Sequence, residues 1–233
     1  MDVFTNNMFF GIFISLVAFE IGLFIYKKTK FPLFNPLLIA TILVIGFLKI
    51  FNIDFDTYNK GGQFINIFLG PATIVLAVPL YKNLSLLKKN FLPIFTGIFV
   101  GSLVSVLSVI SISLFLGLDS SLTVSLLSKS VTTPIGIEIT NSLGGTSSIT
   151  VLAIVLSGII GAVVGPTVFK VLRINHPIAK GVSLGTASHA VGTSKALEIG
   201  ETEGAMSSLS IGVAGIITVF LAPVCYSILS IFI

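Results

Sequence analysis

The stretch Lys129-Ser-Val-Thr-Thr-Pro-Ile-Gly-Ile-Glu138 places a lysine, three hydroxyl side chains and a proline inside an otherwise apolar chain. Sixty positions later, His189-Ala-Val-Gly-Thr-Ser-Lys-Ala-Leu-Glu198 repeats the same pattern. In this register the valines, threonines and glutamates of the two stretches coincide, and Lys129 pairs with His189. The chain therefore contains two copies of a unit of about sixty residues, each with one polar interruption.

The composition is that of an integral membrane protein. Of the 233 residues, 54% are hydrophobic and only 9% are charged, and the mean hydropathy is +1.09. Soluble domains carry about 25% charged residues. The apolar runs are about twenty residues long, which is the length that an α-helix needs to cross a bilayer core of about 30 Å. We therefore expect an all-α, polytopic helical membrane protein.

Six apolar runs are expected as full spans, and the two polar stretches as broken or re-entrant helical hairpins. Residues 1–90 would form a three-helix scaffold, and residues 91–233 would hold the repeats, as 91–150 and 151–210 followed by the last span, all in one membrane domain. Prolines at 71 and 79 predict a kink in the third span. The expected spans are 8–26, 33–50, 62–81, 91–116, 146–170 and 204–232, and the expected hairpins are 120–145 and 180–200.

Basic residues predict the orientation of these spans. Lysines and an arginine gather at 27–30, 82–89 and 170–180, and such clusters favour the cytoplasmic side of a plasma membrane. Both termini are then outside. Each repeat crosses the membrane an odd number of times, so the second copy is inverted, as in many secondary transporters. In the competing topology both polar stretches cross fully and residues 170–180 lie outside. The first apolar run contains Glu20 and lacks a basic leader, so we expect it to stay as a span and not to be removed as a signal peptide.

The two interruptions are candidates for a binding site. Pro134 and the glycines at 185 and 192 predict unwinding near the middle of the membrane. Unwound backbone is tolerated there where it is buried in protein or lines a watery cavity, and a helix that begins after a break offers free amides to a small anion such as a carboxylate. The candidate substrate-binding residues are Lys129, Ser130, Thr132, Thr133, Thr186, Ser188, His189, Thr193 and Ser194.

Charged residues near the interruptions are candidates for ion coupling or charge pairing. His189 is the side-chain type that gains and loses a proton near neutral pH. Lys195 and Glu198 are three residues apart and can pair on one helix face, and Glu138 can pair with Lys129 or Lys195 across the repeats. Glu20 is a further candidate for ion coupling. The alternatives are structural: hydroxyls in membrane helices often bond to the preceding turn, and His189 would be a hydrogen-bonded core residue.

Other classes of site are poorly supported by the sequence. His176 and His189 are thirteen residues apart without the spacing of zinc ligands, and there is no glycine-rich phosphate loop or nucleophile elbow. Cys225 stands alone, which excludes a disulfide framework and favours packing. The net charge of +4 comes from lysines between apolar runs, so nucleic-acid binding is not expected. Neither enzymatic activity nor a cofactor is expected.

Three segments carry a resemblance to a known family. They are Gly70-Pro-Ala-Thr-Ile-Val-Leu-Ala-Val-Pro-Leu-Tyr-Lys82, Lys129-Ser-Val-Thr-Thr-Pro-Ile135, and Gly185-Thr-Ala-Ser-His-Ala-Val-Gly-Thr193 with the following residues 201–205. Through them the chain resembles the LrgB/CidB family over nearly its whole length. The resemblance implies a small hydrophobic LrgA/CidA-like partner. Members are described either as antiholin-like modulators of murein hydrolase activity and lysis, or as carriers of pyruvate, glycolate or glycerate.

The paired interruptions favour the second description, because alternating access around a fixed site uses such breaks. The expected function is secondary transport of small monocarboxylates. In this hypothesis Lys129 and the half-helix amides hold the carboxylate, hydroxyls bond its remaining oxygens, and His189 couples binding to a proton. The alternative is an antiholin-like regulator of lysis that transports no substrate. A homo-oligomer is compatible with the small-residue faces at Gly97/Gly101 and Gly161/Gly165.

Overall fold

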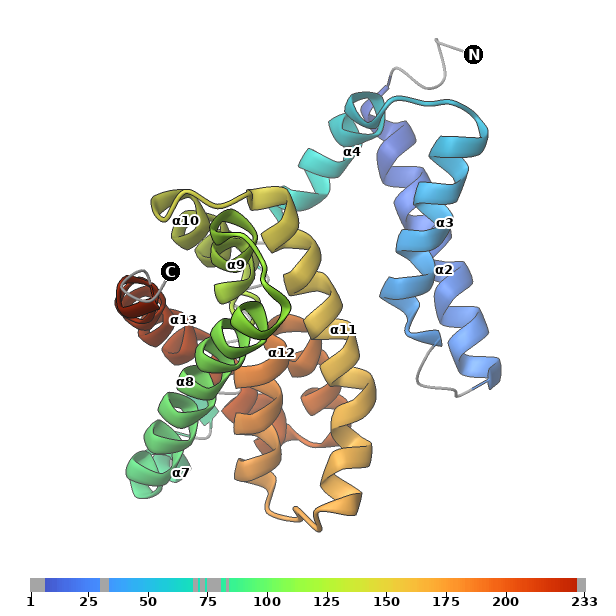
Figure 1. Cartoon of the computed structure of the whole chain (residues 1–233). Helices are drawn as coiled ribbons and strands as arrows, with labels where there is room; N and C mark the ends of the chain where they lie inside the picture. Colours follow the sequence, from blue (N-terminus) through green and yellow to red (C-terminus); the bar gives the residue numbers. More distant parts are fainter. Residues whose placement is uncertain are drawn as a thin grey trace. The chain divides into compact units, whose positions relative to one another are not determined.

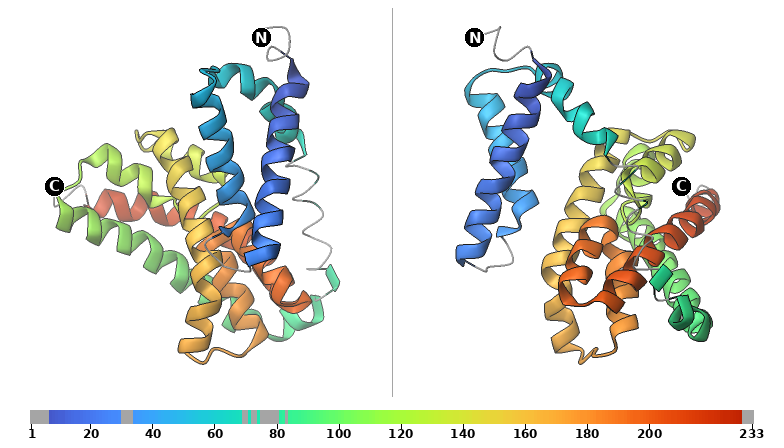
Figure 2. Two further views of the ribbon diagram at one scale, coloured as in Figure 1. Left: turned by 90° about the vertical axis from the view of Figure 1, so that its right-hand side faces the viewer. Right: turned by 180° about the vertical axis from the view of Figure 1, so that it is seen from behind.

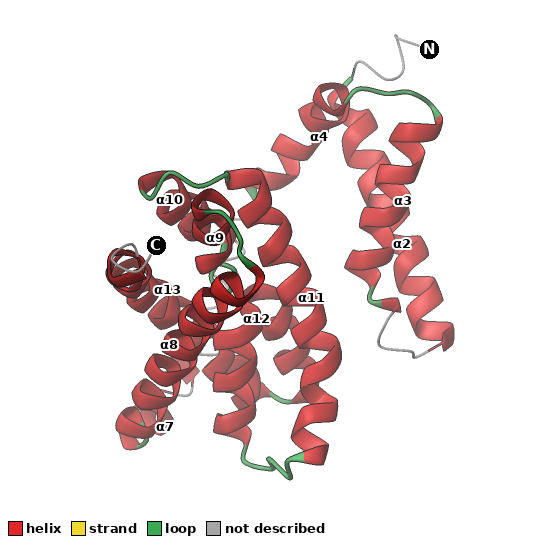
Figure 3. Cartoon of the chain, in the orientation of Figure 1, coloured by secondary structure: helices red, strands yellow, loops and turns green. Residues whose placement is uncertain are grey.

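The computed structural model describes residues 7–29, 34–68, 71, 74, 81–82 and 84–229. All regular secondary structure in these ranges is helical, which confirms the all-α class (Figure 3). The chain divides into two compact units, residues 1–75 and 76–233, and each is described by itself (Figure 1).

Four described helices are long and apolar enough to cross a membrane. They are α2 (Met8–Thr29), α8 (Phe91–Leu116), α11 (Ser147–Val171) and α13 (Glu201–Leu229). The chain is therefore a multi-pass membrane protein. The second expected span is the shorter helix α3 (Pro36–Ile50), with 15 residues. Half of the third expected span (62–81) lies outside the described residues, and so does Pro79, one of the two prolines that predict its kink.

The first unit contains α2, α3 and α4 (Phe55–Ile67), and α2 packs against both of the others. Helix α3 begins at Pro36, three residues after the expected start at 33. The Asn35 side chain accepts a hydrogen bond from the Leu37 amide at 2.9 Å and Pro36 occupies the first turn, and both features favour a helix start there. Helix α4 begins at Phe55, within the stretch 51–61 that separated the second and third expected spans.

Helix α4 forms because its first turn suits a helix start and its inner face has a partner. Asp54 is the N-cap residue and Asp56 lies in the first turn, where the helix dipole favours negative charge. Tyr58 Oη lies 2.8 Å from Ser15 Oγ on α2, and Gly61 packs directly on the backbone of α2 near Gly11. Hydropathy alone does not predict such polar contacts and small-residue packing between helices.

The second unit repeats one motif, a long helix followed by a helical hairpin. In the first copy α8 precedes α9 (Ser120–Leu127) and α10 (Thr133–Ser142); in the second, α11 precedes α12 (Pro177–Ile199). The short helix α7 (Leu84–Lys89) leads into α8, and α13 follows α12. Figures 1 and 2 show α11 running alongside α12, and α9 and α10 lying together beside one end of α11.

The first polar stretch is a hairpin whose turn is non-helical from residue 128 to residue 132. Its two arms fold back on each other: Ser128 Oγ lies 3.2 Å from Thr140 Oγ1, and Ser125 Oγ accepts a hydrogen bond from the Thr146 amide at 2.7 Å. Pro134 lies in the first turn of α10, where it needs no amide partner. The proline therefore lies at the start of the second arm, and the unwinding predicted beside it occurs just before it, at residues 128–132.

The second polar stretch is also a hairpin, because α12 consists of two helical arms on either side of a kink. Its bend lies at His189, with φ of 41° and ψ of −125°. Leu184 and Ala196 belong to one hydrophobic cluster across the bend, and a Cβ atom at Gly192 would collide with the Leu184 carbonyl oxygen. The glycines at 185 and 192 were expected to unwind the helix. Instead they are helical, and they allow close approach of α13 and of the opposite arm.

The first arm of α12 lies between α8 and α11, and both long helices approach it through glycines. On α8, Gly97 faces Val182 and Gly101 faces Thr186; on α11, Gly161 faces Ser188 and Gly165 faces Leu184. Two glycines four residues apart on each helix remove the side chains that would hold the backbones apart. The small-residue faces thus serve packing within one chain.

Candidate functional site

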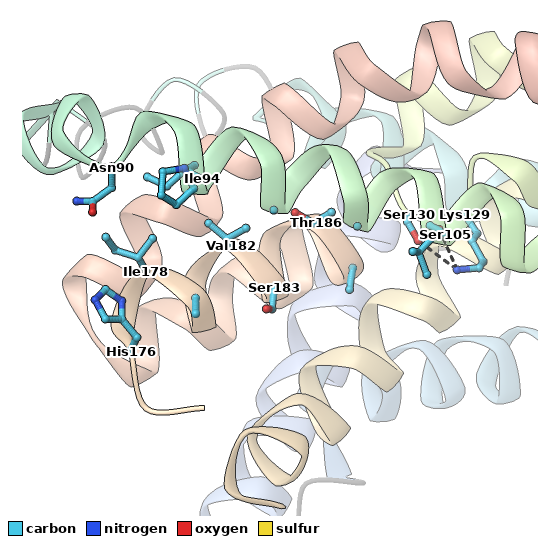
Figure 4. Close-up of a pocket in the computed structure, with 16 residues that line it drawn as sticks. Asn90, Ile94, Ser105, Lys129, Ser130, His176, Ile178, Val182, Ser183 and Thr186 are labelled. Atoms are coloured by element: carbon cyan, nitrogen blue, oxygen red, sulfur yellow. Dashed lines mark hydrogen bonds between the residues drawn. The ribbon is translucent and has the colours of Figure 1, made fainter. Parts of the chain in front are cut away.

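A groove of about 720 Å³ runs between α8 and the first arm of α12 (Figure 4). At one end it is lined by Lys129, Ser130 and Ser105, and at the other by His176 and Asn90. Both ends are polar, whereas most of the wall between them is apolar. The groove therefore connects the turn of the first hairpin with the loops that begin α8 and α12.

The Lys129 amine ends the groove and is held by two hydroxyls. Lys129 Nζ donates to Ser130 Oγ at 3.2 Å and to Ser105 Oγ at 3.3 Å, and Ser105 Oγ donates to Ser130 Oγ at 2.9 Å. In the part of the chain that the structure describes, no carboxylate forms an ion pair with this amine. Placing a lysine in a membrane interior costs about 2.5 to 3.5 kcal/mol, so an uncompensated amine there can be stabilised by an anionic ligand.

Thr186 adds a hydroxyl to the wall near Lys129. Its side chain is 6% exposed, it lines the groove, and its Oγ1 atom has no hydrogen-bond partner among the described residues. A buried polar atom without a partner costs free energy. Thr186 packs against Gly101, one helical turn from Ser105. Its Oγ1 atom is itself buried, so this hydroxyl is a polar part of the wall and is not assigned to a ligand at Lys129.

His189 lies outside the groove, at the tip of the second hairpin. Its side chain is 4% exposed and its Nε2 atom lies 3.1 Å from the Ile154 carbonyl oxygen on α11, so Nε2 must carry the hydrogen. The ring also lies against Gly158, the only residue type that leaves room for it. A positive φ is strained for any residue other than glycine, and such strain gathers at functional sites.

The two interruptions meet on one turn of α11. Ser157 Oγ donates to the Lys129 carbonyl oxygen at 2.7 Å and lies 3.1 Å from the Ile154 carbonyl oxygen, which is also the partner of His189. The backbone of the first hairpin and the imidazole of the second are thus held by residues 154 and 157. The structure brings Lys129 and His189 to a common element, although only Lys129 faces the groove.

The other predicted hydroxyls are placed differently. Thr193 Oγ1 donates to the His189 carbonyl oxygen at 2.9 Å and lies 2.7 Å from Ser207 Oγ on α13, so it holds the hairpin together. Ser188 is fully buried against Gly161, without a hydrogen-bond partner in the described chain. Ser194 is exposed and bonds back to Ala190. Thr132 caps α10, and neither it nor Thr133 is among the residues that line the groove.

The charged candidates are also spread apart. Lys195 and Glu198 form an ion pair on one face of α12, with 2.7 Å between Nζ and Oε2. Glu138 is exposed on α10, and Glu20 is exposed on α2 in the other unit. His176, expected to be solvated, is exposed at the mouth of the groove.

Sequence reasoning missed Ser105, the second hydroxyl that holds the amine. Its signal was present: Gly97, Gly101 and Ser105 form a row of small residues at intervals of four along α8. Gly97 and Gly101 were used only to predict a helix-packing face. Because a row at this interval follows one helix face, it also marks the face that borders the groove.

The chain is similar to known proteins over almost its full length. Residues 15–228 match the LrgB-like family. Antiholin-like protein LrgB of Bacillus cereus (strain B4264) and that of Bacillus anthracis (strain A0248) are each 43% identical over 220 residues, covering 94% of this chain and 96% of the relative. No solved structure matches the chain. Both the matched length and the identity show that this protein belongs to the LrgB-like family.

Proposed function

We propose that this protein is a secondary transporter of small monocarboxylates of the pyruvate, glycolate and glycerate class. The observation that carries the proposal is the Lys129 amine at the end of the groove, held by Ser105 and Ser130 and without a carboxylate partner among the described residues. A carboxylate bound there gains charge-assisted hydrogen bonds from the amine.

The proposed cycle uses the two hairpins as moving elements around this site. Their turns are tied to residues 154 and 157 of α11, so a shift of one hairpin changes the surroundings of the other. The proposal includes inverted repeats, six spans, both termini outside the plasma membrane, and a small LrgA/CidA-like partner. It assigns two roles to His189. The residue couples the movements of the two hairpins, and its ring takes up and releases the proton that is transported with the substrate. No catalytic step or cofactor is part of it.

A second candidate function is supported by the names of the relatives. Both Bacillus proteins are called antiholin-like, which favours a regulator of lysis over a transporter. In this candidate the protein would act through association with partners in the membrane, and the groove would have no substrate. The two functions differ in one measurable respect, the saturable movement of an acid across a bilayer.

Uptake into proteoliposomes tests the proposal. Labelled pyruvate, glycolate and glycerate are offered to vesicles that contain the purified protein, with and without the LrgA/CidA-like partner. We expect saturable uptake that is lost in Lys129→Ala, while Lys170→Ala, which removes an exposed lysine that does not line the groove, retains it. Absence of uptake in every vesicle, together with a change in lysis timing when the protein is expressed in cells, would favour the regulator.

A further inference from the structure

We infer that the groove accepts monocarboxylates with an aliphatic tail, and that such medium-chain acids bind more tightly than three-carbon acids. The inference rests on the proposed carboxylate site at Lys129 and concerns what lies beyond it. The groove has a volume of about 720 Å³, in the range of pockets that hold drug-sized ligands, about 300 to 1,000 Å³. A three-carbon acid at Lys129 fills only one end of it.

The length of the groove follows from the residues of α8 that line it. Lining residues run from Ser105 back to Asn90, and at a rise of 1.5 Å per residue this separation is about 22 Å. Figure 4 shows the order along the groove: Lys129 and Ser105 at one end, then Thr186 and Val182, and finally the end near Asn90. A tail that starts at the amine therefore has a continuous path along α8.

The wall along this path is mostly apolar. Beyond Thr186, the path passes Val182, Ile178 and Ile94, with Gly97 opposite Val182. Among the lining residues, the ammonium group of Lys129 lies at one end of the groove and the imidazole of His176 at the other. One amine at one end and a mostly aliphatic wall beyond it match one carboxylate with one hydrocarbon tail.

The size of the expected gain follows from the burial of methylene groups. Each buried methylene contributes enough transfer free energy to tighten binding about fourfold. The dissociation constant should therefore fall by about this factor for each carbon added, until the tail fills the apolar section. A site that recognises only the carboxylate and its neighbouring oxygen would show no such dependence.

Two glycine variants distinguish binding of the tail in the groove from partition of the acid into the surrounding lipid. Gly97 borders the groove, and a Cβ atom there would lie at an ordinary 3.5 Å from Val182 Cγ1, so Gly97→Leu places its side chain across the path of the tail. Gly212 lies on α13 with open space around it, so Gly212→Leu is the matched control. Partition of an acid into the bilayer is the same for both variants.

The experiment measures competition by straight-chain acids of three, four, six and eight carbons against a labelled three-carbon acid, on the full-length protein in lipid nanodiscs. The readout is the half-inhibitory concentration of the three-carbon acid divided by that of the eight-carbon acid. We expect a ratio well above one in the native protein and in Gly212→Leu, and a ratio near one in Gly97→Leu.

Each other result is decisive. Binding of the three-carbon acid without any gain for longer acids overturns this inference and leaves the proposed function standing. An equal gain in Gly97→Leu and Gly212→Leu also overturns it, because the gain then comes from bilayer partition or from a groove occupied by lipid. Absence of binding for acids of every length removes the proposed function, and this inference with it.

Discussion

Among single residues, Ser105 has the clearest testable role, because it holds the Lys129 amine in position at the end of the groove. The amine has two hydroxyl partners, and Ser105 is the one supplied by a different element, α8. Ser105→Ala leaves the amine with Ser130 alone, free to move away from the groove. A hydrogen bond to a charged group contributes about 1.5 to 3 kcal/mol, so we expect carboxylate affinity to fall by about tenfold or more. Equilibrium binding of a labelled three-carbon acid measures this loss.

Ser108→Ala is the matched control for Ser105→Ala. Ser108 lies one turn further along α8, and among the described residues its hydroxyl bonds to the Ser105 carbonyl oxygen alone, at 2.8 Å. This variant should keep the native affinity. If both serine variants lose affinity equally, the effect arises from general disturbance of α8 and the assigned role of Ser105 is wrong.

His189 offers a test of backbone strain. Its φ of 41° costs a residue with a Cβ about 1 to 3 kcal/mol, and glycine is exempt. His189→Ala and His189→Gly both lose the bond to Ile154, so their difference reports the strain together with the intrinsic preference for alanine over glycine. In an ordinary helix alanine is more stable than glycine. Here we expect His189→Gly to be the more stable by about 1 kcal/mol, or roughly 3 °C in the midpoint of thermal unfolding. A more stable alanine variant would contradict the bent conformation.

Among the helices, the contact between the glycine rows and the second hairpin determines how well the hairpin packs. A Cβ atom at Gly161 would overlap Ser188 Oγ, and this hydroxyl has no hydrogen-bond partner in the described chain. We expect Gly161→Ala to destabilise the protein by about 1 to 3 kcal/mol through overpacking. Ser188→Ala alone should be nearly neutral, and the double variant should recover part of the loss. Thermal unfolding of the three variants provides the double-mutant cycle.

One outcome of that cycle would contradict the contact between Gly161 and Ser188. If Gly161→Ala and Ser188→Ala are additive, the two residues are not in contact, and the first arm of α12 does not lie on α11 as described. Gly97→Ala serves as the control on the other side of the same arm, because its Cβ atom would lie at an ordinary contact distance from Val182. This control should keep the native stability.

Elements were predictable from the sequence where one strong local signal decides them. The long apolar helices and the two interruptions follow from hydropathy and from the sixty-residue repeat. Helix α4 was missed because its stability depends on Tyr58 reaching Ser15 and on Gly61 fitting against α2, which are contacts between elements. The bend at His189 was attributed to glycines, since sequence alone does not show that these glycines are needed for packing. Lys129, Ser130 and Thr186 line the groove, whereas Thr193 was placed in the binding site although its hydroxyl bonds within the protein.

The second unit has one basic end, which favours one orientation of this unit in the membrane. Asn90 and His176 line the same mouth of the groove, so the segments that precede α8 and α12 lie at one end of the unit. Basic residues at this end are Lys88 and Lys89 at the end of α7, Lys170 at the end of α11, Arg173 in the following loop and Lys180 in the first turn of α12. Lysine and arginine favour the cytoplasmic side, so a single face suits both segments. A hairpin at residues 120–145 gives this result, whereas a full crossing of that stretch would separate the segments.

Labelling of single cysteines decides between these two topologies. In a Cys225→Ala background, Lys89→Cys and Arg173→Cys probe the two basic segments, and Ser148→Cys probes the opposite end of α11, a helix of 25 residues and hence about 37 Å long. All three positions are exposed. A membrane-impermeant maleimide added to intact cells should label Ser148→Cys only, and in inverted vesicles it should label the other two. If Lys89→Cys and Arg173→Cys react from opposite faces, the first polar stretch crosses the membrane, and the inverted arrangement on which alternating access depends is lost.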